Sequence, residues 1–181
     1  GCCGDAAIDS VVVDEAPTCP WPTGFAMTGR SDSSVVMSWN DPTGSTWDLQ
    51  WGPPGFTQAS PGAGTQSTTT NPDTIHGLQS NTDYEVYVRT DCGPNGTSIW
   101  IGPILVRTAC SPFMAPYSDN FDNSPNNAVP YCWSNHLASS SAVAQTYQAG
   151  SPNSAPNHIR FYSGSPAGPA DTTLLISPKF S

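Results

Sequence analysis

The sequence is poor in charged residues, and basic residues are especially scarce. Only 10% of the 181 residues are Asp, Glu, Lys or Arg, and five basic residues stand against fourteen acidic ones. The resulting net charge of −9 leaves no basic surface to neutralise phosphates, so nucleic acid is not an expected partner. No apolar run approaches the ~20 residues of a membrane-spanning helix, and we expect no membrane span. A signal peptide is also lacking, so a secreted chain would be a mature or cropped product.

Recognisable catalytic motifs are lacking as well. The sequence contains three histidines, His76, His136 and His158, and none lies in a known catalytic pattern. It contains no HExxH, no GxSxG and no phosphate-binding glycine-rich loop. We therefore expect a protein that is not an enzyme and that needs no cofactor, a structural Ca²⁺ excepted.

What the sequence does contain is an abundance of turn-forming and aromatic residues. It has 16 Gly and 19 Pro, together with six Trp, six Tyr and six Phe. Gly and Pro interrupt regular structure, and the frequent Ser, Thr and Asn compete with helix hydrogen bonding. The aromatic residues supply material for a core. The composition predicts an all-β chain that folds.

The six cysteines are present without CxxC pairs or Cys/His clusters. That pattern argues against zinc and favours disulfides formed in an oxidising compartment. We therefore expect an extracellular or cell-surface protein. The cysteines are Cys2, Cys3, Cys19, Cys92, Cys110 and Cys132.

The middle of the chain reads as a succession of short strands. Between Trp47 and Trp51, residues Trp47, Leu49 and Trp51 alternate with Asp48 and Gln50, which indicates a strand buried on one face. Turn signals rich in Gly, Pro, Asn and Asp separate the strands, as in a β-sandwich. The expected strands are Ser34 to Trp39, Trp47 to Trp51, Thr65 to Thr70 at a sheet edge, Asp83 to Thr90, and Ile104 to Thr108.

Residues 17–109 resemble a fibronectin type III domain. A Cys-Pro-x-Pro run begins at Cys19, Trp39 ends the second strand, and Leu78 is followed six residues later by Tyr84. In that family the Trp lies in the core, and the Leu and Tyr form a tyrosine corner whose hydroxyl bonds back to the backbone. The cysteine positions are similar to those in type III modules of secreted multidomain proteins of Bacteroidota-type bacteria.

The resemblance implies a disulfide pattern. In a seven-stranded sandwich of alternating strands, Cys19 precedes the first strand and Cys92 ends the sixth, so both lie at one pole and should bond. The long loop between them implies a stabilisation of roughly 4 kcal/mol in the chain-entropy treatment. Cys110 leaves the last strand at the opposite pole and must pair outward, and Cys132 is its expected partner.

The same strand arrangement brings Arg89 close to Trp100. We expect a cation–π stack on the sheet surface, worth about 0.5–1 kcal/mol. A Trp that binds a ligand is the alternative interpretation.

Residues 110–181 resemble part of a MAM-like or choice-of-anchor jelly roll. In such domains an aromatic-acidic strand, here Tyr117 to Asp122, is followed by a Pro-x-Cys-Trp turn, here at Pro130. The segments His158 to Tyr162 and Leu174 to Pro178 look like two further strands of that fold. The stretch is shorter than a whole domain of this family, so we expect a partial jelly roll.

We expect residues 1–16 to form an N-terminal strand and linker, in which the run from Ala7 to Asp14 resembles the last strand of such a jelly roll. Two interpretations follow. The chain is cropped from an array of alternating modules, or residues 6–14 complete the jelly roll of another molecule. Cys2 and Cys3 are adjacent, and because a bond between neighbouring cysteines is strained, one or both should pair elsewhere. The apolar residues of this candidate assembly strand are Ile8, Val11, Val12 and Val13.

The fold expected for the middle of the chain argues against completion of the jelly roll by residues 6–14 of the same molecule. Residue 16 enters the sandwich at one pole and residue 110 leaves at the other, and a domain of this size is roughly 30 Å across. Head-to-tail completion between molecules does not close on itself and would generate a filament.

A cluster of acidic and amide residues is the candidate metal site. Asp119, Asn120, Asp122 and Asn123 offer the oxygen ligands that suit Ca²⁺, with Asp119 and Asp122 as the charged ligands. The alternative is that these residues form turns on a solvated loop.

Four positions match glycosylation patterns. Asn95 begins an Asn-Gly-Thr sequon. Ser10, Thr74 and Thr172 follow an Asp and precede an aliphatic residue or Thr, which resembles the O-glycosylation pattern of Bacteroidota-type secreted proteins.

The expected function is therefore that of an extracellular structural or adhesive module. If residues 6–14 complete the jelly roll of another molecule, the module would polymerise head-to-tail into a filament. Its partners would be copies of itself or neighbouring modules of a longer chain. The alternative is a glycan-binding accessory region of a secreted hydrolase, with surface glycans as partners.

Overall fold

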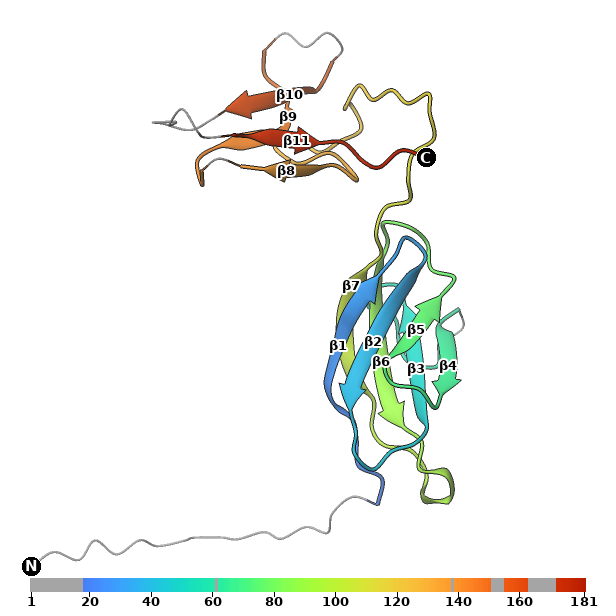
Figure 1. Ribbon diagram of the computed structural model, residues 1–181. Coiled ribbons are helices and arrows are strands. Elements are labelled where there is room, and N and C mark those ends of the chain that lie inside the picture. The colour runs from blue at the N-terminus through green and yellow to red at the C-terminus, as the bar shows by residue number, and fades with distance from the viewer. Residues whose placement is uncertain (1–17, 61, 138, 151–154, 163–171) are drawn as a thin grey trace, which may run out of the picture. The chain divides into compact units, whose positions relative to one another are not determined.

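The structure is a computed structural model in which β-strands make up nearly all of the regular structure (Figure 1). The residues that it describes are 18–60, 62–137, 139–150, 155–162 and 172–181. No helix among these residues is long and apolar enough to cross a membrane.

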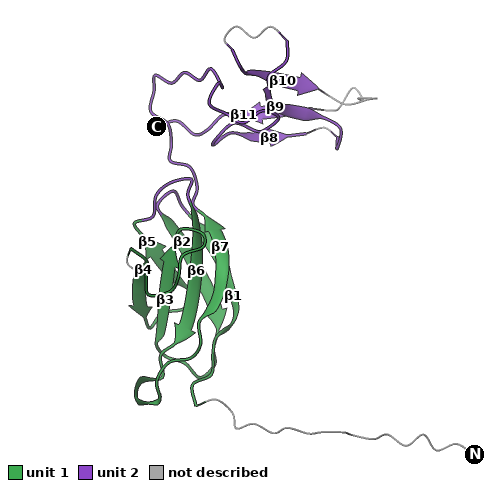
Figure 2. Ribbon diagram, turned by 180° about the vertical axis from the view of Figure 1, so that it is seen from behind, with its two compact units in different colours: residues 1–30, 34–77, 83–107 green, residues 31–33, 78–82, 108–181 purple. Residues whose placement is uncertain are grey.

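The chain forms two compact units (Figure 2). The first unit contains strands β1 to β7 and the second contains β8 to β11. The predicted N-terminal strand falls within residues 1–16, outside the described residues. The first unit comprises residues 1–30, 34–77 and 83–107, and the second comprises residues 31–33, 78–82 and 108–181.

The first unit is a sandwich of two antiparallel sheets, which confirms the predicted all-β fold. One sheet has the order β1-β2-β5 and the other the order β4-β3-β6-β7. The strands are β1 (Thr23–Arg30), β2 (Ser34–Asn40), β3 (Trp47–Gly52), β4 (Gly64–Thr68), β5 (Asp73–His76), β6 (Asp83–Thr90) and β7 (Ile101–Arg107).

The core lies between these two sheets and follows the alternation of the sequence. In β2, Val35, Met37 and Trp39 are buried and the residues between them are half-buried. The Trp39 ring packs edge-to-face on Trp47 of the other sheet, with 5.4 Å between ring centroids. Burial of these large side chains is the main stabilising term of the sandwich. The other buried apolar residues of the two sheets are Phe25, Leu49, Ile75, Val86, Val88 and Val106.

The sequence pattern predicts that Gln50 lies on the exposed face of β3. This prediction is wrong, because Gln50 is buried. The loop that follows β3 folds back over the outer face of the four-stranded sheet. There the backbone N–H of Ala59 donates to the Gln50 Oε1 at 3.1 Å, and Phe56 packs against Tyr87 with 5.5 Å between ring centroids. This bond pairs the buried oxygen of the Gln50 amide.

Strand β7 begins three residues earlier than the sequence predicted. Gly102 and Pro103 interrupt the pattern, yet both lie within the strand. The register with β6 shifts between Val86 and Val88, which marks a bulge opposite them. Because β7 is at the edge of its sheet, a proline there removes no hydrogen bond to a further strand.

The second unit contains two small antiparallel sheets. Strand β9 (Val143–Tyr147) pairs with β10 (His158–Tyr162), and β8 (Ser134–His136) pairs with β11 (Leu174–Ile176). The strands predicted near His158 and Leu174 are therefore confirmed. The disulfide Cys110–Cys132 and the ring contacts of the unit support the sheets. The rings in contact are Phe113–Tyr117, Tyr117–Phe180 and Phe121–Trp133.

The aromatic-acidic strand expected from Tyr117 to Asp122 is not a strand. Asp119 and Asn120 instead accept the backbone N–H groups of the residues two positions on, Phe121 and Asp122. Side chains of this type compete with sheet hydrogen bonds and form turns. The Pro-x-Cys-Trp turn is present, because the Trp133 N–H donates to the Pro130 carbonyl at 3.1 Å.

Candidate functional site

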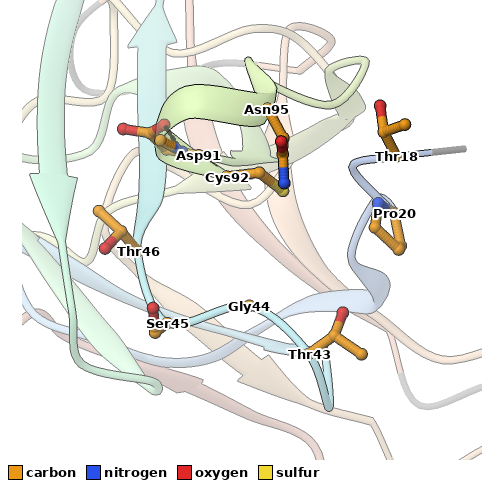
Figure 3. A pocket seen from close by; sticks show the side chains of 10 residues that line it. Thr18, Pro20, Thr43, Gly44, Ser45, Thr46, Asp91, Cys92 and Asn95 are labelled. Carbon is orange, nitrogen blue, oxygen red and sulfur yellow. Dashed lines mark hydrogen bonds between the residues drawn. The ribbon is translucent and has the colours of Figure 1, made fainter.

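The first candidate region is the end of the sandwich closed by the Cys19–Cys92 disulfide. The pairing is the predicted one, with 5.8 Å between the Cα atoms. A hollow of about 450 Å³ opens beside it, between the loop that precedes β3 and the short 3₁₀ turn η1 (Gly93–Asn95) (Figure 3). Its polar lining residues are Thr18, Thr43, Ser45, Thr46, Asp91 and Asn95.

The chemistry of this hollow is that of hydroxyl, amide and carboxylate groups. The residues that line it include no aromatic and no basic side chain. The Asp91 carboxylate already accepts the Gly93 N–H at 2.9 Å, and the Asp91 N–H donates to the Thr46 carbonyl at 2.9 Å. Sequence reasoning missed the hollow because three segments distant in the chain form it, and no motif marks it.

The loop beside the hollow is held by Asp41. Its carboxylate accepts hydrogen bonds from the Trp47 indole at 2.9 Å and the Thr90 hydroxyl at 2.7 Å. Burial raises the pKa of Asp41, but the hydrogen bonds from Thr90, Trp47 and the backbone N–H groups of Gly44 and Thr43 outweigh it. The pKa falls from 3.8 to about 2. Asp41 is therefore an ionised anchor of the loop.

The second region is the outer face of the four-stranded sheet, where the predicted cation–π stack is present. The Arg89 guanidinium lies 4.5 Å from the centre of the Trp100 ring. Its Nε donates to Asp48 at 2.9 Å, and the Ser67 hydroxyl donates to the other oxygen of that carboxylate at 2.6 Å. One face of Trp100 is thus covered by the protein itself, which supports the structural interpretation of this residue.

The third region is the β9–β10 sheet of the second unit. Side chains alternate across it, so that Phe161 of β10 lies on the same face as its partner Ala144 and the neighbouring Thr146. Ala144 and Thr146 are 0% exposed, but Phe161 is 57% exposed. On the opposite face, Arg160 stacks on Tyr147 with 4.6 Å to the ring centre. A large apolar side chain on the core side of this sheet is thus left uncovered.

The β8–β11 sheet has a similar open face. Leu174 and Ile176 of β11 point to one side, opposite His136 and Ser134 of β8, and all four residues are exposed. Leu174 is 45% and Ile176 is 48% exposed. Both sheets of the second unit therefore present apolar side chains to solvent.

The candidate calcium ligands lie in a loop whose carboxylates already accept protein hydrogen bonds. Asp119 accepts the Tyr117 hydroxyl at 2.8 Å, and Asp122 accepts the Asn120 side-chain amide at 2.6 Å and the Asn157 N–H at 3.2 Å. Burial, followed by the bond to Asp119, raises the pKa of Tyr117.

These bonds support the turn interpretation of the loop. Across the described part of the chain, no three His, Cys, Asp or Glu side chains are grouped to hold a metal. The calcium site stays a prediction.

The remaining predicted positions are spread over the chain. Asn95 is exposed on η1, Thr74 is half-buried in β5, and Thr172 is exposed before β11. Their glycosylation stays a prediction. Ser10 and the assembly-strand residues Ile8, Val11, Val12 and Val13 lie outside the described residues, as do Cys2 and Cys3.

Comparison with known proteins finds similarity of fold only. No protein-family model matches the chain, and no curated protein matches it. A solved fibronectin type III domain of the human collagen α-1(XX) chain is 21% identical, covers 59% of this chain and 98% of that domain, and has a TM-score of 0.47. The FN5 domain of Drosophila Lar is 20% identical, covers 50% of this chain and 96% of that domain, and has a TM-score of 0.41.

Chicken CNTN1 domains FN1–FN3 are 17% identical, cover 49% of this chain and 31% of that chain, and have a TM-score of 0.42. The class of the first unit is assigned from its own strand order and from a core that contains Trp39. It is a fibronectin type III-like sandwich.

Proposed function

We propose that this chain is a non-enzymatic, extracellular structural module whose copies join one another by adding a strand to the second unit. Two disulfides support an oxidising, extracellular location, because such bonds persist where thiols are not kept reduced. The disulfide-bonded sandwich would act as a spacer between the joining parts.

The observation that carries the proposal is the exposed apolar surface of the second unit. Phe161, Leu174 and Ile176 are each about half exposed, although they belong to strands that a complete sandwich would cover. Two-stranded sheets are marginally stable by themselves, and a further strand adds both hydrogen bonds and apolar cover. The second unit is thus a partial jelly roll that a strand from elsewhere would complete.

The proposed donor is the segment of residues 6–14 from another copy. It contains three consecutive β-branched residues, Val11 to Val13, and Ile8, which suit a strand. Donation from each copy to the next is a heterologous contact that does not close, so it produces a filament.

The test is the assembly state of a donor-strand variant. Val11→Lys with Val13→Lys should abolish polymers and leave folded monomers, because charged side chains cannot enter an apolar face. Sedimentation velocity measures the polymers, and circular dichroism checks the fold. Thr57→Lys with Thr69→Lys adds the same charge at exposed positions of the sandwich and should leave assembly unchanged. Polymers of unchanged length in the Val11 and Val13 variant would contradict the proposal.

Glycan binding by an accessory region of a secreted hydrolase is the second candidate. It is favoured by Tyr162, which is 46% exposed on the face where Arg160 stacks on Tyr147. Aromatic rings presented in this way suit the apolar faces of sugars. Monomeric protein that binds a glycan array, and that fails to do so after Tyr162→Ala, would favour this candidate over assembly.

A further inference from the structure

We propose that β10 is the strand to which the incoming segment is added, and that residues 6–14 of a second copy cover Phe161. This inference rests on the proposed function. It names the strand edge that receives the incoming segment, which the proposed function does not specify. Three properties of β10 carry it: its edge, its exposed core side chain and its charge.

The first property is the edge. Strand β9 pairs with β10 along one side, and on its other side the Thr146 N–H donates to the Ala128 carbonyl at 2.8 Å. The Asn127 N–H returns a bond to the Thr146 carbonyl at 3.0 Å. Among the described residues, no backbone hydrogen bond from a third segment reaches β10. Within the described part of the chain, the unpaired edge of this sheet is therefore that of β10, and we infer that the strand is added there.

The second property is the side chain that this edge exposes. A strand added beside β10 would lie about 4.8 Å away, with its side chains next to those of β10 on each face. On the core face its neighbours would be Ile159, which is half-buried, and Phe161, which is 57% exposed. A Val of the incoming strand would cover the Phe161 ring and remove apolar surface from water.

The third property is charge. Strand β10 carries Arg160, one of only five basic residues in the chain, beside His158. Residues 6–14 contain no basic residue, and in a strand whose Val11 and Val13 face Phe161, Asp14 would lie on the face of Arg160. Complementary charges of this kind set the register of two strands more than they strengthen the contact.

The alternative acceptor in the second unit is β11, and it fits less well. It has three residues, Leu174 to Ile176, and none is charged, whereas β10 has five residues. A longer acceptor pairs with more of a nine-residue segment, and each ladder bond adds to the stability of the joint. The length and the charge both favour β10.

The test compares one substitution on each sheet. Phe161→Glu should raise the protein concentration needed for polymers about tenfold or more, because the incoming apolar strand would meet a carboxylate. Ile176→Glu places the same charge at a comparably exposed position of β11, and it should raise that concentration less than Phe161→Glu does, because β11 is not the strand to which the segment is added. Circular dichroism shows whether both variants fold.

A second measurement maps the contact directly. A photo-reactive phenylalanine at Val12, in a mixture of ¹⁵N-labelled and unlabelled protein, should cross-link to residues 158–162 of a differently labelled copy. Cross-links to residues 172–181, or cross-links confined to one isotope, would overturn the inference, since they indicate β11 or the same chain as acceptor.

The outcomes separate this inference from the function on which it rests. If the Val11 and Val13 lysine variant loses its polymers while Phe161→Glu keeps them, the filament stands and β10 is not its acceptor. If the unsubstituted protein remains monomeric at all concentrations, both the filament and the acceptor edge fail together.

Discussion

At the scale of single residues, Asp41 shows how one short side chain organises a turn. Its two oxygens accept five hydrogen bonds, from the N–H and hydroxyl of Thr43, the N–H of Gly44, the Trp47 indole and the Thr90 hydroxyl. A Cβ at Gly44 would collide with this carboxylate, so glycine is needed for the close approach. Asp41 thereby ties the loop before β3 to the end of β6.

The depressed pKa of Asp41 predicts an acid-sensitive sandwich. Because the folded-state pKa of about 2 is below the ordinary 3.8, the stabilisation is present above about pH 4 and is lost as the pH falls through about 2. Asp41→Asn should be less stable at pH 6 but lose less free energy of unfolding between pH 4 and pH 2. Urea unfolding followed by tryptophan fluorescence at several pH values measures both.

Asp91→Asn is a suitable control, since the Asp91 carboxylate accepts a single backbone bond, from Gly93. An Asp41→Asn variant that loses as much stability in acid as the unsubstituted protein would refute the role assigned to this carboxylate.

At the scale of strands, the two sheets are held together by their shared core and by one covalent link. Cys19 lies just before β1 and Cys92 just after β6, so their bond joins segments of the two different sheets. The sequence separation is 73 residues, and closing so long a loop removes much entropy from the unfolded chain.

Removal of this disulfide should therefore destabilise the sandwich. Cys19→Ala with Cys92→Ala is expected to lower the free energy of unfolding by about 4 kcal/mol, as the loop length implies. Hydrogen exchange of the β3 and β6 amides, measured by mass spectrometry, reports this loss. The unsubstituted protein under reducing conditions should show the same faster exchange, and unchanged exchange in the variant would contradict the expectation.

At the scale of the whole molecule, the dominant electrostatic property is a net charge of −9. Copies that approach one another repel over distances set by the salt concentration. The single Arg160 on β10 cannot offset this charge, since an exposed ion pair contributes only about 0–1 kcal/mol. Assembly of the proposed kind must therefore overcome a long-range repulsion.

Assembly should accordingly strengthen with salt. Raising NaCl from about 0.01 M to about 0.1 M shortens the screening length from about 30 Å to about 10 Å, which weakens repulsion between copies more than contacts within the joint. Sedimentation velocity should show longer polymers at the higher salt concentration. Polymers that shorten would mean that ion pairs, rather than apolar cover, hold the copies together.

Sequence patterns predicted the sandwich and both disulfides found among the described residues. The strand predicted from Ser34 to Trp39 is β2, and Trp39 is buried in the core, as the resemblance to the type III family implied. The order of the strands brought Cys19 to Cys92, since antiparallel neighbours return the chain to the same end.

Which side chains are covered depends on tertiary packing, which the sequence patterns did not predict. Gln50 alternates as a solvent-facing residue, but a returning loop buries it, and Phe161 alternates as a core residue, yet nothing in the described chain covers it. The alternation of apolar and polar residues along a strand predicts the face on which each side chain lies. Whether another segment packs on that face depends on contacts between residues far apart in the chain, and for Phe161 we propose that the segment belongs to another molecule.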